Sequence, residues 1–183
     1  IVVVLPFVII QPLQILSSRS ALIDNLNEEY NTLIEVEVNT TIATLVEQVD
    51  LLSLFAQNDQ LEELLEDASE SYTGTPEQIE ASLLQIDEQW IAAPDNDALI
   101  QSVFNTSASV PLSEFVTLFP DHVEMFLTDA KGALVASTNR TSDYYQADEV
   151  WWQSAYNNGE GQVYISPEVE FDASSDVIAT QFA

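Results

Sequence analysis

The feature that most constrains the fold is a stretch from Ser20 to Leu65 that contains no Gly or Pro. Apolar residues recur three and four positions apart in two runs, the first Leu22, Leu26, Tyr30 and Leu33, and the second Val38, Ile42, Leu45, Val49, Leu52 and Ala56. This spacing places the side chains on one face of a helix. We therefore expect a long helix with one apolar seam, which packs either in a bundle core or against a second copy of the helix.

The two ends of the chain indicate a fragment of a longer protein. Residues 1–10 (IVVVLPFVII) are an uncharged apolar run, whereas a membrane-spanning helix needs about 20 apolar residues. We interpret residues 1–16 as a truncated transmembrane anchor and residues 17–70 as a long membrane-proximal helix. A signal-peptide remnant and a buried strand or helix are the alternatives for the anchor. Residues 177–183 are typical of a strand, and no turn follows them, so we expect truncation at the C-terminus.

The charge balance excludes several classes of function. The chain has 31 acidic residues against 3 basic residues, and its net charge is −28. Binding of nucleic acid or of an anionic lipid surface requires basic patches, which three basic residues cannot form. Hydrophobic residues make up 46 % of the chain, which is too many for intrinsic disorder. The acids are spread evenly after residue 23, which indicates a general surface adaptation more than one binding patch.

The second half of the chain predicts a mixed domain over residues 71–183. Thr75, Pro76 and Gln78 are a helix start with a capping box, and that helix places Leu83 and Trp90 on one face. Other segments carry helix, strand or turn patterns. These are short helices over 97–104, 112–119 and 148–156, a β-hairpin over 123–138 with its turn at 129–132, and strands over 161–166 and 177–182. The pattern favours an α+β fold with an antiparallel sheet flanked by helices.

Reactive constellations are missing from the sequence. Without Cys, disulfides, thiolate nucleophiles and Cys-based zinc sites are excluded. The single His, His122, lies at a corner between a helix and a strand, where we expect a surface residue rather than a general base. One His cannot form a His-based zinc site, and no calcium-binding loop motif is present. We expect no catalytic residues, no metal and no cofactor, and we do not expect this fragment to be an enzyme.

The most informative segment runs from Thr141 to Tyr164 and concentrates Tyr and Trp residues. In a helix over 148–156, Trp151 and Trp152 share a face, and Asp148 and Glu149 precede them. An acidic aromatic site favours a cation or an amine through charge pairing and cation–π contact. The alternative is that both indoles are core residues packed between a helix and the sheet.

The run from Phe119 to about Val177 resembles the extracytoplasmic Cache sensor domains of bacterial and archaeal receptors. The similar segments are the strand before TDAKG, the ALVAST strand, the SDYYQADE turn, the WW helix and the GQVYIS strand. The resemblance implies a PAS-like sheet with flanking helices, preceded by a transmembrane helix and a long supporting helix. It also implies a cytoplasmic output domain, such as a kinase, a cyclase or a chemoreceptor signalling region, beyond this fragment.

The amino-acid-binding branch of that family provides a partial match for a ligand pocket. Tyr144, Trp151 and Trp152 match the aromatic positions of its motif, whereas the Arg position is occupied by Glu149. Glu149 would repel a ligand carboxylate that Arg grips with two hydrogen bonds. The resemblance thus favours an amine or another cation over an amino-acid carboxylate. It gives Tyr164 and Asp172 as the counterparts of the later pocket residues.

Together, these features predict a ligand-sensing domain of a transmembrane receptor on the extracytoplasmic side of the cell membrane. The predicted ligand-binding residues are Tyr144, Asp148, Glu149, Trp151, Trp152, Tyr164 and Asp172. The expected partners are a small-molecule ligand, the membrane through the N-terminal helix, and a second copy through the long helix. The alternative is a structural or dimerisation ectodomain that binds no small molecule.

Overall fold

The computed structural model describes the backbone of residues 4–172 and 176–183, and the side chains of residues 19–171 and 176–183. The chain divides into two compact units, Ile1–Leu51 and Leu52–Ala183. The truncated anchor expected at residues 1–16 lies outside the described side chains. No helix within the residues that the structure describes is both long and apolar enough to cross a membrane.

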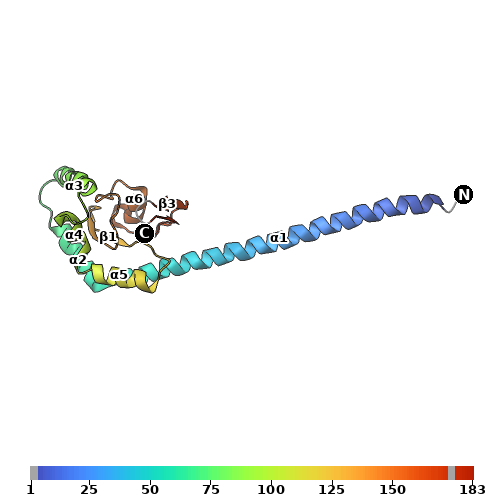
Figure 1. Cartoon of the computed structure of the whole chain (residues 1–183), viewed down its shortest axis with the longest axis horizontal. Coiled ribbons are helices and arrows are strands. Elements are labelled where there is room, and N and C mark those ends of the chain that lie inside the picture. The colour runs from blue at the N-terminus through green and yellow to red at the C-terminus, as the bar shows by residue number, and fades with distance from the viewer. Residues whose placement is uncertain (1–3, 173–175) are drawn as a thin grey trace. The chain divides into compact units, whose positions relative to one another are not determined.

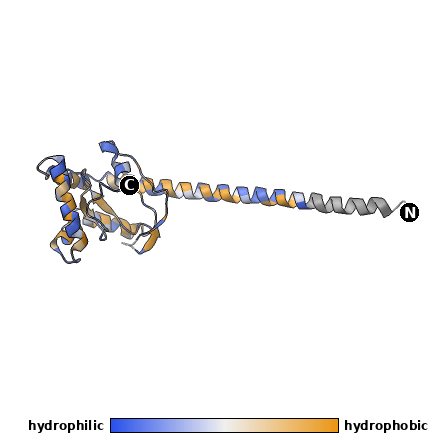
Figure 2. Cartoon of the chain, turned by 90° about the horizontal axis from the view of Figure 1, so that it is seen from above, coloured by the Kyte–Doolittle hydropathy of each residue, from blue (hydrophilic) through white to orange (hydrophobic). Residues whose placement is uncertain are grey.

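The first unit consists of a single long helix. Helix α1 (Val4–Ala56) has 53 residues, and its last residues, 52–56, belong to the second unit (Figure 1). Hydrophobic residues repeat along it (Figure 2). Six side chains of the expected seam keep 44 to 65 % of their surface exposed, and these are Leu22, Leu26, Tyr30, Leu33, Val38 and Ile42. Apolar residues outside the seam, such as Ile34 and Val36, are equally exposed, so α1 carries exposed apolar side chains on more than one face.

The helix expected over 17–70 is divided in two. Helix α1 ends at Ala56, and α2 (Asp59–Glu70) begins after Asn58, which has an extended backbone. The side-chain oxygen of Asn58 accepts a hydrogen bond from the amide of Gln60 at 2.9 Å, which satisfies one of the free N–H groups of the new helix. Leu61 is buried, so α2 is more than a solvated continuation of α1.

Three further helices precede the strands. They are α3 (Pro76–Ala92), α4 (Ala98–Phe104) and α5 (Ser109–Leu118). The predicted capping box is confirmed at the start of α3, where Thr75 and Gln78 exchange hydrogen bonds between side chain and backbone. Asp97 caps α4 by accepting from the amide of Leu99 at 2.9 Å. Helix α5 begins three residues before the predicted position.

The core of the second unit forms where these helices meet the first hairpin. Trp90, Ile100, Val103 and Leu134 make one buried cluster. The indole N–H of Trp90 donates to the carbonyl oxygen of Thr141 at 3.0 Å, so this side chain is fully buried without an unsatisfied donor. The prediction that Leu83 and Trp90 lie on one buried face of α3 is confirmed.

The predicted β-hairpin is confirmed. Strand β1 (Phe126–Thr128) pairs antiparallel with β2 (Leu134–Ser137), and Phe126 lies opposite Ser137. In the turn, Asp129 Oδ1 accepts from the amides of Lys131 at 2.7 Å and Ala133 at 3.1 Å. An Asp side chain mimics a backbone turn in this way, so the local sequence favours the hairpin turn.

The strands near the C-terminus form a separate pair. Strand β3 (Glu170–Asp172) pairs antiparallel with β4 (Val177–Ala179). The segment expected as a strand over 161–166 forms only an isolated bridge between Ile165 and Phe182. The α+β class is therefore confirmed, with two small two-stranded sheets in the described part of the chain. One continuous PAS-like sheet stays a prediction.

The helix that carries the two tryptophans begins later than predicted. Helix α6 (Val150–Tyr156) begins two residues after the predicted start at 148, and the preceding Glu149 makes no side-chain cap. The reason is a turn in which the amide of Glu149 donates to the carbonyl of Gln146 at 3.1 Å. A short 3-10 helix, η1 (Asn157–Gly159), follows α6 directly.

Candidate functional site

Tyr144, the first of the predicted ligand-binding residues, packs against the core. Its ring lies 5.8 Å from the ring of Trp90. Asp87 of α3 fixes the backbone here, because its Oδ1 accepts from the amides of Tyr144 at 2.6 Å and Tyr145 at 3.1 Å. Burial, together with the nearby Asp129 carboxylate, raises the pKa of Tyr144 above its ordinary value. Tyr144 is thus held by packing, whether or not it also contacts a ligand.

The two tryptophans of α6 attach this helix to the first hairpin. The ring of Trp151 meets the ring of Phe126 edge-on at 5.5 Å. The indole N–H of Trp152 donates to Oγ1 of Thr128 at 3.0 Å, and its ring stacks on Tyr156 at 4.5 Å with an interplanar angle of 21°. Both indoles are half-buried. They pack against the hairpin and against Tyr156, and neither indole is fully buried.

Carboxylates gather at the N-terminal end of α6. The pKa of Glu149 is raised, first by partial burial and then by the negative charges of Asp148 and Asp143. Burial and the charges of Glu80 and Asp148 likewise raise the pKa of Tyr145. None of these four carboxylates forms an ion pair with a basic side chain within the described region. This part of the second unit therefore has a negative potential that attracts cations.

The remaining two predicted residues are not joined to this group. Tyr164 is half-buried, and its backbone exchanges hydrogen bonds with Ala183 at 2.6 and 2.9 Å. In the described structure its side chain has no hydrogen bond or ring contact with α6. The side chain of Asp172 lies outside the described residues, although its backbone belongs to β3. The structure thus brings Asp148, Glu149, Trp151 and Trp152 together on and beside one helix.

Two surface cavities lie elsewhere in the second unit, beside α4 and α5. Their volumes are about 780 and 840 Å³, and no sequence-predicted site residue lines either cavity. The first contains Arg140 and His122. His122 was expected at the surface but is half-buried, with its ring 5.1 Å from that of Phe115. A signal for this cavity existed in the sequence, because Arg140 is one of only three basic residues.

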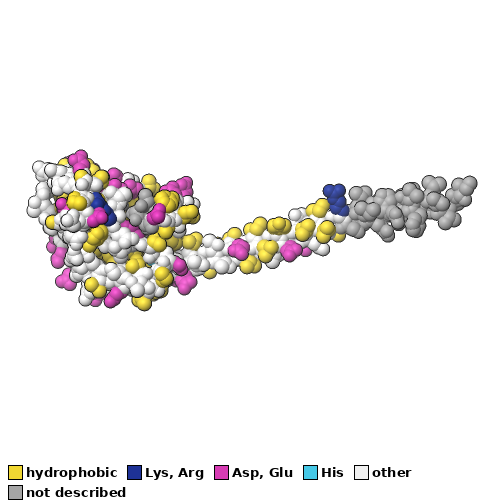
Figure 3. Space-filling view, viewed as in Figure 1, with side chains coloured by type: hydrophobic (Ala, Val, Ile, Leu, Met, Phe, Trp, Pro, Cys, Tyr) yellow, Lys and Arg dark blue, Asp and Glu magenta, His cyan; other side chains and the backbone are white. Residues whose placement is uncertain are grey.

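The polar and aromatic groups gathered at α6 are carboxylates, indoles and a phenol. Within the described residues, no three His, Asp or Glu side chains are grouped as metal ligands. Acidic side chains also spread over the visible face of the second unit, outside the α6 group (Figure 3). Comparison with models of known families, with curated proteins and with solved structures gives no match for this chain.

Proposed function

We propose that this chain is the extracytoplasmic ligand-sensing part of a transmembrane signalling receptor with a PAS-like Cache sensor module. The resemblance over Phe119–Val177 supports the family, and the apolar run at residues 1–10 supports a membrane anchor. The α+β second unit and the long α1 agree with the layout that the resemblance implies. The ligand in this proposal is a small amine or another cation.

The observation that carries the ligand class is the stacked pair Trp152 and Tyr156 on the helix that Asp148 and Glu149 precede. Partial burial, and then the charges of Asp148 and Asp143, raise the pKa of Glu149, and no basic side chain in the described region pairs with these carboxylates. A ligand ammonium group would offset the repulsion and would contact aromatic surface at the same place, because Trp152 and Tyr156 stack on the same short helix. An anionic ligand would meet only repulsion there.

A continuous path of contacts leads from this site toward α1. Trp152 is bonded to Thr128 of β1, β1 pairs with β2, and β2 contacts α5. Phe115 of α5 meets Phe55, near the end of α1, at a ring distance of 5.0 Å. In the proposal, a ligand at α6 biases the position of the hairpin, and α5 passes this bias to α1. Two states with different ligand affinity are required for such coupling.

Binding of a monoamine, a diamine and a quaternary ammonium compound to the full chain tests the proposal. We expect saturable binding that weakens with added salt, because the attracting charges are exposed. The double variant Asp148→Asn/Glu149→Gln should weaken binding roughly three- to tenfold, as expected for two exposed charge contacts. The control Glu88→Gln removes an exposed charge from α3 and should leave binding unchanged. Equal binding by the double variant would contradict the assigned site.

Trp152→Ala separates a ligand role from a purely structural one. If Trp152 serves the ligand, the variant stays folded at 25 °C and loses amine binding. If the side chain only packs, its removal lowers the free energy of unfolding by up to about 3 kcal/mol, at the low end for an aromatic residue because the indole is half-buried, and the amines bind neither protein. Unfolding in urea and calorimetric titration of the same samples distinguish the two results.

A structural dimerisation module is the second candidate, and the exposed seam of α1 favours it. A self-associating helix buries such a seam against its copy. Acidic residues on the same helix oppose association, and these are Asp24, Glu28, Glu29, Glu35, Glu37, Glu47 and Asp50. We therefore expect a dimer that becomes tighter as salt screens their repulsion.

Sedimentation equilibrium of the full chain at low and high salt tests this second candidate. Leu26→Ser/Leu33→Ser should weaken the dimer, whereas Asn27→Ser/Asn31→Ser changes polar positions of the same helix and should not. A dimer that forms while every amine fails to bind would favour the dimerisation module over the sensor.

A further inference from the structure

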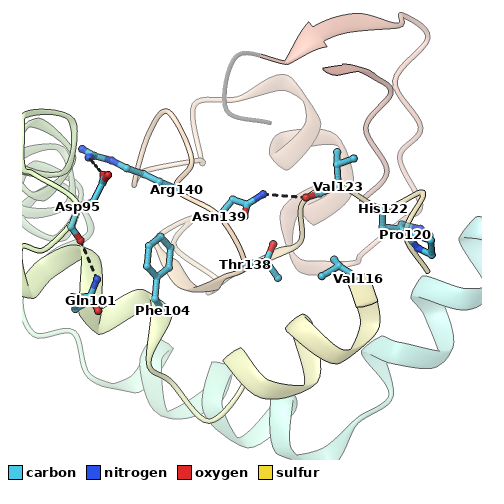
Figure 4. A pocket seen from close by; sticks show the side chains of 10 residues that line it. All are labelled: Asp95, Gln101, Phe104, Val116, Pro120, His122, Val123, Thr138, Asn139 and Arg140. Atoms are coloured by element: carbon cyan, nitrogen blue, oxygen red, sulfur yellow. Dashed lines mark hydrogen bonds and ion pairs between the residues drawn. The ribbon is translucent and has the colours of Figure 1, made fainter. Parts of the chain in front are cut away.

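The cavity that contains Arg140 and His122 is lined by charged, polar and apolar side chains, and it is separate from the α6 group. It is a shallow depression with a volume of about 780 Å³ and is widely open to solvent. Figure 4 shows Phe104 of α4 and Val116 of α5 projecting into it, with Thr138 and Asn139 on the opposite wall. The cavity thus combines an apolar floor with a polar rim.

The charged part of the rim is electrically balanced. Nη1 of Arg140 donates to Oδ1 of Asp95 at 2.8 Å (Figure 4). Nη2 of Arg140 donates to the carbonyl oxygens of Trp90 and Ile91. A guanidinium group has five N–H donors, so these three contacts leave two donors for a ligand. The side chain of Asp95 is 85 % exposed and keeps a second carboxylate oxygen for a ligand hydroxyl.

The uncharged groups of the rim offer donors and acceptors together. The amide nitrogen of Asn139 donates to the carbonyl of Val123 at 3.0 Å, which leaves its side-chain oxygen as an acceptor. Nδ1 of His122 is buried and has no hydrogen-bond partner in the described structure. A buried polar atom without a partner is costly, so a ligand or a water molecule that reaches it would be favoured.

We propose that this cavity binds a small neutral polyhydroxylated molecule, such as a monosaccharide or a polyol. Hydroxyl groups donate and accept, which matches the pairing of Arg140 with Asp95 and the amide of Asn139. The ring of Phe104 provides an apolar surface for the carbon skeleton. The net charge of −28 repels an anion, and the positive guanidinium of Arg140 repels a cation. The site does not depend on the function proposed for α6.

The single His of the chain gives a direct readout of this site. The full chain, free of any His tag and held in a non-glycosidic detergent, is labelled with ¹³C and ¹⁵N at histidine. Glucose, galactose and sorbitol are then titrated, and glycine betaine and succinate are added to parallel samples. We expect the imidazole signals to shift and saturate with a polyhydroxylated probe, with a Kd on the order of 1 mM, and to stay in place with betaine and succinate.

Two variants localise the binding. Val116→Trp fills the cavity and should raise the Kd at least tenfold, whereas Leu118→Trp adds the same indole to an exposed position of α5 and should leave the Kd unchanged. Asp95→Asn keeps the shape of the rim, removes the charged acceptor, and should raise the Kd about fivefold. If Val116→Trp does not fold, the Kd of Asp95→Asn alone tests the site. The proposal is overturned if no polyhydroxylated probe shifts the imidazole at about 50 mM, if betaine or succinate binds instead, or if the foldable variants bind like the wild type.

Discussion

The hydroxyl of Tyr72 donates to Oδ2 of Asp129 at 2.5 Å and joins two segments that are 57 residues apart. Tyr72 follows helix α2, and Asp129 begins the turn between β1 and β2. The other oxygen of Asp129 accepts from two backbone amides of the turn, and the residue is only 3 % exposed. A buried carboxylate without a basic partner is stable only when such donors surround it. Tyr72 is therefore one of the three donors that allow Asp129 to be buried.

Tyr72→Phe removes this donor and leaves Asp129 buried with one fewer hydrogen bond. We expect the free energy of unfolding to fall by about 1–3 kcal/mol, the cost of an unsatisfied buried polar group. Urea unfolding followed by fluorescence measures the loss. Tyr30→Phe changes an exposed tyrosine of α1 that makes no such bond, and it should leave stability within about 0.5 kcal/mol of the wild type.

Stability should fall at alkaline pH because of the same tyrosine. Burial first, and then the hydrogen bond and charge of Asp129, raise the pKa of Tyr72 well above its ordinary value. A pKa that is raised on folding means that the folded state holds its proton more tightly. The stabilisation is complete below the unfolded pKa of about 10 and is lost as the pH rises from there toward the folded pKa. Unfolding measured between pH 8 and 11 should show this decline, and Tyr72→Phe should have a flatter profile. An identical slope in the variant would refute the assignment.

Gly132 occupies a position that no other residue fits. Its φ is +80°, and an added Cβ would lie 2.5 Å from Cβ and 2.6 Å from the backbone nitrogen of Ala147. Gly132→Ala should therefore destabilise the second unit by more than about 2 kcal/mol, because strain and a clash with backbone act together. Gly161→Ala has a similar φ of +68° and open space around it, so it should cost only about 1 kcal/mol. If the two variants lost equal free energy of unfolding, the Cβ added at position 132 would not clash with Ala147, which would contradict this account.

Glu149→Gln should stabilise the folded unit slightly at neutral pH. The raised pKa of Glu149 means that its ionised form is disfavoured on folding, so this residue contributes stability at low pH that is lost as the pH rises through the folded pKa. Gln lacks the charge and avoids the loss. Because most of the side chain faces solvent and only part of it is buried, we expect a gain below about 0.5 kcal/mol at pH 7 that disappears near pH 3. A variant that is less stable than the wild type at pH 7 would mean that Glu149 has a favourable partner.

Features set by neighbouring residues were predictable from the sequence. The capping box of Thr75 and Gln78 and the hairpin turn at Asp129 depend on contacts within four positions, and both formed as expected. The end of α1 was not predicted, because no Gly or Pro marks it and the signal is a single Asn, Asn58, before an acidic residue. An Asn cap of this kind ends one helix and starts the next only if the new helix also packs, as α2 does by burying Leu61.

The candidate site was only partly predictable for a similar reason. The sequence places Asp148, Glu149, Trp151 and Trp152 near one another because they are neighbours along the chain. It does not show that Tyr144 packs on Trp90, since this contact joins residues 54 positions apart. The cavity beside Arg140 likewise forms where several segments meet in space. The hydrophobic periodicity of any one segment therefore does not predict the cavity.

The most direct test of ligand sensing through α1 uses the absence of cysteine from the chain. Asn39→Cys provides a unique site for a spin label on α1, and pulsed electron resonance measures the distance between labels in two associated copies. With saturating amine we predict a change of about 2 Å or more, the scale of helix shifts in signalling interfaces, and no change in Asp148→Asn/Glu149→Gln at an amine concentration that saturates only the wild type. An unchanged distance in the wild type, in a sample that binds the amine, would contradict relay through α1.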